Sequence, residues 1–265
     1  MDKSIHVILG IDMETDCGHN TPFYEGVQKA TPILLDIFEK KGVKTTFYFT
    51  GDAARQNPGS VELVRGCGHD IGCHSLYHET VGEELYPIPG VKPLLPGEVF
   101  HRLETATQWV EEVAGTRPVS FRGPRLWGST EVVNALEKLG YTSDATYPMY
   151  YFRQRFTPYH PSSRDWTQKG ELKLLEIPNF ADMLMESHDQ STESDRDQWP
   201  VFRTEGADAL MLRVKNFLRF LELRGLPTVL CFYFHPWEFV QMQPAYHYGV
   251  STVMPDPIII EGCGE

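Results

Sequence analysis

Long apolar runs are missing from this 265-residue sequence. No stretch approaches the roughly 18 consecutive apolar residues of a membrane-spanning helix. The apolar run at residues 5–10 is too short for the hydrophobic region of a signal peptide, and a carboxylate cluster follows it directly. We therefore expect a cytoplasmic protein without a transmembrane segment. An exported protein that has lost its leader is the alternative.

Basic side chains are also scarce. Lys and Arg number 24 against 36 Asp and Glu, so the formal net charge is −12. Proteins that bind nucleic acids neutralise phosphates with clustered Lys and Arg, and docking on anionic membranes also needs basic residues. The composition therefore excludes nucleic acid as an expected partner and argues weakly against membrane docking.

Cysteine is sparse, with five residues and no pair at CxxC spacing: Cys17, Cys67, Cys73, Cys231 and Cys263. An odd set without this spacing indicates neither a disulfide framework nor a cysteine-based zinc site. Reduced thiols are consistent with the expected cytoplasmic location.

Strand-like and helix-like segments alternate along the chain. Helical periodicity is found at 25–41, 60–66, 96–115, 130–139 and 206–224, and apolar or β-branched runs at 5–11, 43–50, 70–74, 119–122, 141–146, 172–177 and 226–235. This alternation predicts βαβ units and a single α/β domain over residues 1–265. Seven strands with helices between them fit an irregular (β/α) barrel of parallel strands better than an open sheet. Residues 181–206 are polar and predict a mobile surface excursion.

Polar residues follow the carboxyl ends of the predicted strands. Asp12 and Glu14 end the first strand, and His74 and His78 follow the third. The same edge would hold the three other strand-end residues Arg122, Asp144 and His235. Parallel α/β folds build their sites at this edge, so the sequence predicts a site there.

The spacing of His74 and His78 indicates metal binding. Imidazole is the commonest metal ligand, and residues four apart share one face of a helical turn. Asp12 and Glu14 share one face of a strand, so one carboxylate can complete a metal site of two histidines and a carboxylate. The other carboxylate can then act as a general base.

Each of these residues also has an ordinary interpretation. An isolated histidine pair often decorates a helix end, and strand-end carboxylates such as Asp16 often cap a helix. Arg122 could simply neutralise Asp12, and Asp144 could lie in a turn. Their joint occurrence in this order favours a functional site.

Five segments in order resemble the NodB-type polysaccharide deacetylases across nearly the whole chain. They are GIDME at 10–14, GCHSLYH at 72–78, FRGP at 121–124, SDATYP at 143–148 and FYFHPWE at 232–238. The second segment is moderately specific and each other segment is weak, but five in order are specific. The resemblance implies a deformed TIM barrel and a metal-dependent hydrolase that removes an acetyl or formyl group from an amino sugar.

The resemblance also implies roles for individual residues. Asp12 would be the base, and His74 and His78 would hold a divalent metal. Met13 follows Asp12 where the family's commonest motif has a second Asp, so Glu14 is the expected third ligand, with Asp16 in reserve. Zinc is the first expectation for the metal, and cobalt, nickel, iron or manganese also fit such a ligand set.

Three further roles follow from the same resemblance. His235 would be the general acid for the leaving amine. Arg122 would hold Asp12 in place, and Asp144 would orient or tune His235.

Four residues are candidates for substrate binding. Arg125 stands where the family often has Tyr, and its charge could select an acidic or phosphorylated substrate or simply lie on the surface. Trp127, Tyr147 and Trp237 could stack on a sugar ring. Tyr147 begins an aromatic stretch over 147–159, for which an ordinary packed loop is the alternative.

The expected partner is an N-acylated sugar or glycan, with a lipid-linked or nucleotide-linked sugar as one possibility. Two other functions stay open: hydrolysis of a small non-sugar amide or ureide, and carbohydrate binding without catalysis. The sequence makes no prediction of oligomeric state.

Overall fold

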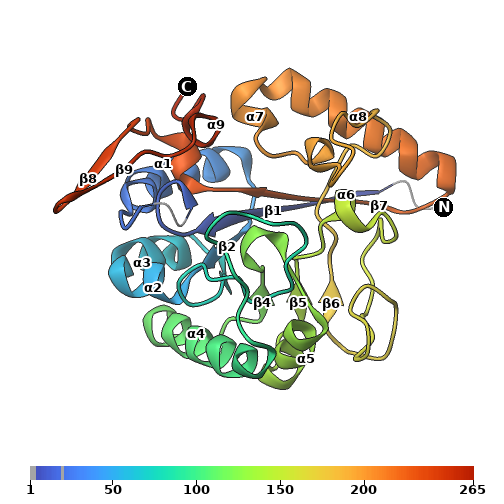
Figure 1. Ribbon diagram of the computed structural model, residues 1–265, viewed down its shortest axis with the longest axis horizontal. Coiled ribbons are helices and arrows are strands. Elements are labelled where there is room, and N and C mark those ends of the chain that lie inside the picture. The colour runs from blue at the N-terminus through green and yellow to red at the C-terminus, as the bar shows by residue number, and fades with distance from the viewer. Residues whose placement is uncertain (1–3, 19–20) are drawn as a thin grey trace.

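A curled parallel sheet forms the centre of the fold. The computed structural model describes residues 4–18 and 21–265, and in this part of the chain seven strands follow the spatial order β6-β5-β4-β3-β2-β1-β7 (Figure 1). Their bounds are β1 (Ile5–Met13), β2 (Thr46–Phe49), β3 (Asp70–Cys73), β4 (Ser120–Phe121), β5 (Ser143–Asp144), β6 (Leu175–Glu176) and β7 (Thr228–Phe234). All neighbouring pairs are parallel, which confirms the predicted α/β barrel class.

Helices cover the outer face of this sheet (Figure 1). Those that follow the strands are α1 (Glu25–Lys41), α2 (Gly51–Gln56), α3 (Pro58–Gly66), α4 (Val99–Ala114), α5 (Thr130–Leu139), α6 (Met149–Phe152), α7 (Val201–Thr204) and α8 (Ala207–Arg224). The chain ends with the hairpin β8 (Tyr246–Tyr248) and β9 (Ser251–Val253) and the short helix α9 (Pro257–Ile260). The sequence analysis missed α2, the hairpin and the three short helices α6, α7 and α9.

The edge strands β6 and β7 are joined by the chain that follows β6. The backbone N–H of Ile177 donates to the carbonyl of Asp144 at 2.7 Å, and that of Phe180 donates to the carbonyl of Cys231 at 2.8 Å. This bridge spans the gap between the edge strands, so the sheet curls into an irregular half-barrel and its interior is narrow.

The period-two alternation of β1 decides which side chains enter that interior. Ile11 and Met13 are buried in the main hydrophobic core with residues of α1 to α5. Asp12 and Glu14 lie one residue out of phase and therefore point to the opposite side of the sheet. Both are buried, and both line the cavity described below.

Residues 181–206 form a largely irregular segment, in which residues 183–196 are all half-buried or exposed. Other parts of it are fixed to the barrel. The side-chain amide of Gln198 donates to the carbonyl of Tyr233 on β7, and the Tyr233 hydroxyl donates to Asp197 at 2.5 Å. Asp182, Asp197 and Gln198 are all buried. The mobility expected for this polar segment stays a prediction.

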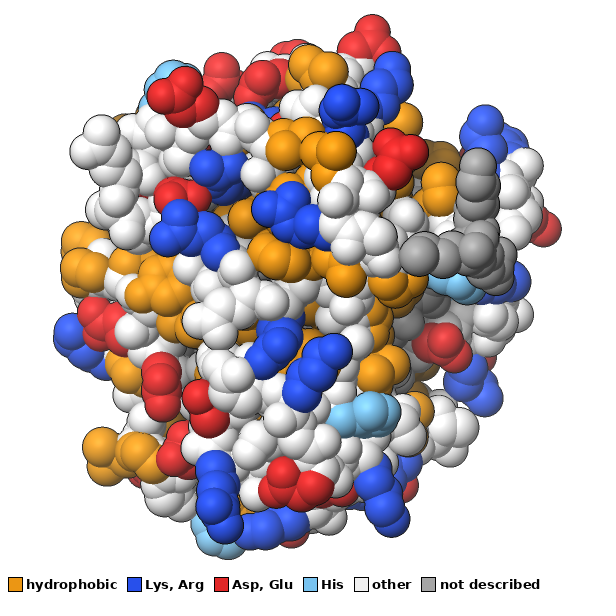
Figure 2. Space-filling model, turned by 90° about the vertical axis from the view of Figure 1, so that its right-hand side faces the viewer, with side chains coloured by type: hydrophobic (Ala, Val, Ile, Leu, Met, Phe, Trp, Pro, Cys, Tyr) orange, Lys and Arg blue, Asp and Glu red, His pale blue; other side chains and the backbone are white. Residues whose placement is uncertain are grey.

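The surface is mixed in character. On the face where the chain begins, acidic, basic and hydrophobic side chains are interspersed (Figure 2). Among the described residues, no helix is long and apolar enough to cross a membrane. All five cysteines lie in the described part of the chain, and no disulfide bond joins any two of them there.

Candidate active site

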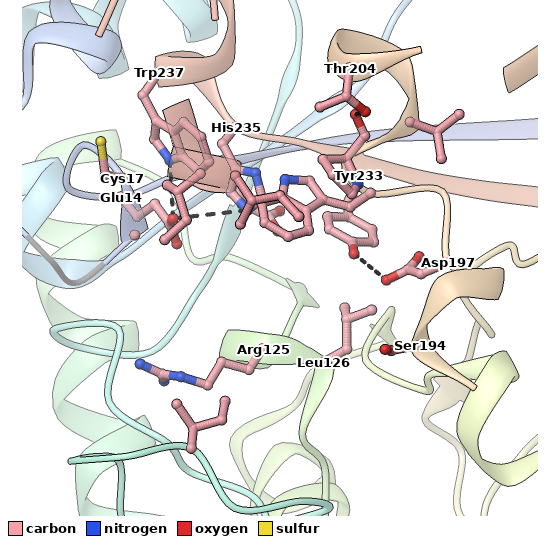
Figure 3. Close-up of a pocket in the computed structure, with 18 of the residues that line it drawn as sticks. Glu14, Cys17, Arg125, Leu126, Ser194, Asp197, Thr204, Tyr233, His235 and Trp237 are labelled. Carbon is pink, nitrogen blue, oxygen red and sulfur yellow. Dashed lines mark hydrogen bonds and ion pairs between the residues drawn. The ribbon is translucent and has the colours of Figure 1, made fainter. Parts of the chain in front are cut away.

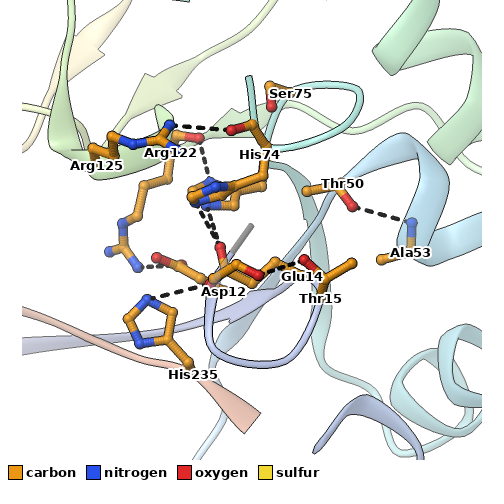
Figure 4. Close-up of polar contacts among 12 residues, drawn as sticks. Asp12, Glu14, Thr15, Thr50, Ala53, His74, Ser75, Arg122, Arg125 and His235 are labelled. Carbon is orange, nitrogen blue, oxygen red and sulfur yellow. Dashed lines mark hydrogen bonds and ion pairs between the residues drawn. The ribbon is translucent and has the colours of Figure 1, made fainter. Parts of the chain in front are cut away.

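Glu14, His74 and His78 come together at the carboxyl edge of the sheet. Their ligand atoms all lie within 4.8 Å of one another, and all three residues are buried. Nε2 of His78 is 2.7 Å from Oε2 of Glu14, and Nε2 of His74 is 3.4 Å from the same oxygen (Figure 4). The predicted ligand set is therefore assembled around one point.

The histidine pair does not lie on a helical turn, so that part of the prediction is wrong. Ser75 and His78 adopt left-handed backbone conformations, with φ of 65° and 62°. The backbone N–H groups of Leu76 and Tyr77 donate to the carboxylate of Glu79, at 3.3 and 2.6 Å. Glu79 thus binds donors at the start of the segment and holds it as a compact loop.

The protonation states suit a divalent cation. Nδ1 of His74 is 2.7 Å from the carbonyl of Arg122, so this nitrogen is the donor and Nε2 turns its lone pair toward Glu14. Burial lowers the pKa of His78 to about 4, which keeps its imidazole neutral. Burial by itself would raise the pKa of Glu14, but His78, His235 and His74 hold that pKa well below its usual value. Two neutral imidazoles and one carboxylate fit such a metal ion.

Asp16, the reserve ligand, has a different role. Its two carboxylate oxygens accept the backbone N–H groups of Glu25 and Gly26, at 2.8 and 2.7 Å. These are the first residues of α1, whose N–H groups lack partners within the helix. Asp16 therefore anchors the helix start, and Glu14 is the carboxylate that faces the histidines.

Asp12 is held by a buried ion pair. Nη1 of Arg122 lies 2.8 Å from Oδ1 of Asp12, and the Arg122 side chain is fully buried. The same guanidinium donates to the carbonyls of Ala145 at 3.1 Å and Phe232 at 3.3 Å. Arg122 therefore contacts Asp12 as the sequence predicted, and the carbonyls fix the direction of its guanidinium.

His235 is oriented by Glu238 from its own turn. Oε1 of Glu238 is 2.8 Å from both Nδ1 and the backbone nitrogen of His235, while Nε2 points toward Glu14 at 3.9 Å. Burial lowers the pKa of His235, but the charges of Glu14 and Glu238 and the hydrogen bond from Glu238 outweigh it and raise the pKa to about 9. The ring of Trp237 stacks on His235 at 4.8 Å.

The expectation that Asp144 orients His235 is wrong, because Glu238 holds that imidazole. Asp144 pairs in register with Glu176 on β6, and Thr146 donates to its carboxylate. Burial raises the pKa of Asp144 to about 7 and also raises that of Glu176. The two carboxyls form a buried pair, and a tuning of His235 by Asp144 stays a prediction. A carboxylate three residues after a turn start is a local capping pattern, so residues 235–238 held the signal for Glu238.

The substrate candidates divide into two groups. Arg125 and Trp237 line the cavity beside the site. Trp127 and Tyr147 are fully buried, where Trp127 packs edge-on against Tyr86 and Tyr147 packs against Phe152. These two rings fill the protein interior, so the expectation that they stack on substrate is wrong.

Arg125 supports the loop that carries His78. Its Nη1 donates to the carbonyl of His78 at 3.1 Å and to the Thr80 hydroxyl at 3.0 Å. Arg125 itself has φ of 60°, a left-handed conformation that a non-glycine residue rarely adopts. The selection of acidic substrates by this cation stays a prediction.

The cavity has a volume of about 810 Å³. It extends from the cluster of Glu14, His74 and His78, hereafter the metal-type cluster, toward residues 194–201 (Figure 3). Its lining includes four residues that the sequence analysis did not select: Tyr86, Asp197, Trp199 and Tyr233. Tyr86, Asp197 and Trp199 lie outside the five motif segments. Tyr233 lies within the segment 232–238, two residues before His235, so it alone of the four had a usable signal.

Comparison with known proteins finds a family match for part of the chain. The polysaccharide deacetylase family model matches residues 20–143, a range that holds His74, His78 and Arg122. The peptidoglycan-N-acetylglucosamine deacetylase of Bacillus cereus is 25% identical over 140 residues, 53% of this chain and 55% of that protein. Chitin deacetylase 1 of Cryptococcus neoformans is 26% identical over 100 residues, 38% of this chain and 19% of that protein. The chain thus spans from a fifth to just over half the length of these relatives.

Solved structures with the same fold cover most of the chain. A candidate polysaccharide deacetylase from Mycobacterium smegmatis superposes with a TM-score of 0.61 at 20% identity, over 88% of this chain and 77% of that one. Puue allantoinase superposes with a TM-score of 0.57 at 16% identity, over 88% and 78% of the two chains. At these identities the similarity establishes the fold.

A first prediction concerns Gly10, which makes room for Arg122. A Cβ atom at residue 10 would lie 2.2 Å from Nη1 of Arg122. We expect Gly10→Ala to displace the guanidinium from Asp12 and lower the free energy of unfolding by about 1–3 kcal/mol. Urea denaturation measures this loss. Gly59→Ala in α3 is the control, because nothing lies within 4 Å of its added Cβ. A Gly10→Ala protein as stable as the wild type would show that this packing is unimportant.

Proposed function

We propose that the chain, whose residues 20–143 match the polysaccharide deacetylase family model, is a metal-dependent hydrolase that removes an N-acyl group from an amino sugar or a related glycan. The observation that carries the proposal is the buried Glu14, His74 and His78 cluster, flanked by Asp12 on Arg122 and by His235 on Glu238. A base and an acid on either side of a metal site suit amide hydrolysis.

Glu14, His74 and His78 would hold the metal. Zinc is our first choice, and cobalt, nickel, iron or manganese suit the same ligands. When bound, such a cation polarises the amide carbonyl and makes a water molecule easier to deprotonate. Hydrolysis of a small amide or ureide without a metal would give no reason for three buried ligand atoms to converge.

Asp12 would act as the general base. Arg122 fixes its carboxylate through Oδ1, and the side chain lines the same cavity as the three ligands. In this position Asp12 takes a proton from the attacking water. Arg122 acts by holding that carboxylate in one orientation.

His235 would act as the general acid. Glu238 accepts the Nδ1 proton and stabilises the imidazolium, so Nε2 carries the proton that faces the cavity. His235 donates this proton to the leaving nitrogen when the tetrahedral intermediate collapses, and the amine is released neutral. Trp237, stacked on the ring, keeps the imidazole in this plane.

The base assignment predicts the effect of Asp12→Asn. We expect acetate or formate release to fall by about 10²–10⁴-fold, because the amide cannot accept the proton, while metal and substrate still bind. A release assay across N-acetylated and N-formylated sugars measures this, with the exposed Asp70→Asn as the control. Near-normal turnover by Asp12→Asn would exclude Asp12 as the base. Substrate binding by a wild-type protein that never turns over would instead indicate a carbohydrate-binding protein.

The metal assignment predicts the effect of His78→Ala. Wild-type protein should bind one equivalent of zinc, and loss of a ligand should weaken binding by at least about tenfold. Metal analysis after dialysis against graded zinc concentrations measures the affinity. His101→Ala is the matched control, since that side chain is 80% exposed on α4. Equal zinc affinity in both variants would place the metal elsewhere.

The acid assignment predicts a shift in pH dependence. His235 must be protonated to act, so activity falls as pH rises through its pKa, which Glu238 helps to raise to about 9. Glu238→Gln removes the stabilising charge, and the alkaline limb of the kcat/KM profile should move to lower pH. An unchanged alkaline limb in this variant, with Asp256→Asn as the control, would assign that limb to another group.

A further inference from the structure

The cavity beside the catalytic groups is surrounded by segments from many parts of the chain. Its lining includes residues from 86–89, 123–126, 194–205 and 258–261, together with the metal-type cluster and His235. Segments so far apart in the chain converge around one cavity of about 810 Å³, and this size suits a short ligand better than a long polymer.

Residues 194–201 make a firm wall because several groups hold their backbone. Arg213 on α8 donates through Nη1 to the carbonyls of Asp195 and Asp197, at 2.5 and 3.0 Å. The side chain of Gln198 donates to the carbonyl of Tyr233. This wall is therefore formed before any ligand binds, which lowers the entropic cost of recognition.

Asp197 is the buried acceptor on this wall (Figure 3). The residue is only 7% exposed, its carboxylate receives the hydroxyl of Tyr233 at 2.5 Å and the backbone N–H of Gln198 at 2.7 Å, and it lines the cavity. A carboxylate can accept about four hydrogen bonds, so further donors can be bound. Burial raises the pKa of Asp197 to about 7, and a new donor would stabilise its charged form.

Tyr233 links this acceptor to the catalytic strand. It precedes His235 by two residues on β7, so both side chains lie on the same side of the strand. Their rings meet edge to face at 5.8 Å. A group that binds Asp197 is therefore placed at a fixed distance from the proposed general acid.

The rest of the lining is mainly aromatic and aliphatic, and includes Tyr86, Ile88, Leu126, Tyr150 and Trp199. Flat apolar surfaces with a few fixed polar groups suit a ring that has apolar faces and hydroxyl groups at its rim. A volume of about 810 Å³ falls within the range of pockets that enclose a small molecule.

We propose that this cavity recognises one or two sugar units that are presented as a chain end or a small glycoconjugate, and that Asp197 is its specificity-determining hydrogen-bond acceptor. The inference rests on the proposed N-deacylase function and adds the substrate class to it. The size of the cavity sets the limit of one or two units, so we expect a chain end or a small glycoconjugate rather than an internal unit of a polymer.

The first test maps where deacetylation occurs. Zinc-loaded wild-type protein is incubated with N-acetylglucosamine oligomers of one to six units, with free and with chemically reduced ends, and tandem mass spectrometry locates the free amine. We expect product at one terminal unit and no gain in kcat/KM beyond two units. Comparable deacetylation of internal units, or rates that keep rising with length, would overturn the inference. The reduced oligomers show which end enters, and activity on the dimer shows whether a small glycoconjugate suffices.

The second test isolates Asp197. Asp197→Asn should raise KM for the dimer by at least about tenfold, with kcat and zinc affinity unchanged, because a hydrogen bond to a charged acceptor is lost. Glu222→Gln is the control, since Glu222 is exposed on α8, does not line the cavity and should keep the wild-type KM. An unchanged KM in Asp197→Asn would overturn the role of Asp197.

A further variant tests the same role of Asp197 in case Asp197→Asn does not fold. Tyr233→Phe keeps the carboxylate and removes the hydroxyl that fixes it, so KM should rise severalfold while the melting temperature stays near that of the wild type. An unchanged KM in this variant would also contradict the proposal. If wild-type protein with zinc hydrolyses no N-acyl sugar, the proposed function fails and this inference falls with it. Hydrolysis confined to internal units refutes this inference only.

Discussion

The buried guanidinium of Arg122 is the interaction on which the rest of the site depends. From the end of β4 it forms an ion pair with Asp12 on β1 and donates to carbonyls at Ala145, after β5, and Phe232 on β7. It also lies 4.6 Å from the ring centroid of Tyr48 on β2. One cation thus connects five strands in the interior of a narrow half-barrel. A buried charge without such partners would be strongly destabilising, so the strands and the guanidinium fix each other.

The same residue connects the two halves of the proposed chemistry. Its side chain fixes Asp12, and its backbone carbonyl accepts the Nδ1 proton of His74, which turns Nε2 toward Glu14. Base and metal ligand are therefore positioned by one residue. His235 is positioned separately, by Glu238 in its own turn. The acid can consequently be adjusted without disturbing the metal cluster, whereas a change at Arg122 affects both the base and a ligand.

The fold and the ligand set could be predicted because both follow from short-range rules. Strand periodicity places Asp12 and Glu14 on one side of β1, and parallel strands bring their carboxyl ends together. The helical turn predicted at residues 74–78 does not form, because the backbone N–H groups there donate to the carboxylate of Glu79. Periodicity contains no information on such a side-chain contact.

The other errors concern partners chosen by position in a motif. Asp144 was assigned to His235, but its neighbour across the sheet is Glu176, and the local Glu238 has the shorter path to the imidazole. The polar composition of residues 181–206 predicts a surface segment, and residues 183–196 are half-buried or exposed. Composition does not show that Asp197 and Gln198 of this segment bond to Arg213 and to β7, because those contacts join residues far apart in the chain.

The central claim is that Glu14, His74 and His78 hold one metal ion next to Asp12. The most direct measurement is anomalous diffraction at the zinc absorption edge from crystals grown with zinc. The account predicts a single strong peak in contact with Oε2 of Glu14 and Nε2 of both histidines, within reach of Asp12. A peak at the cysteine thiols or at Asp16, with no density among these three residues, would contradict it.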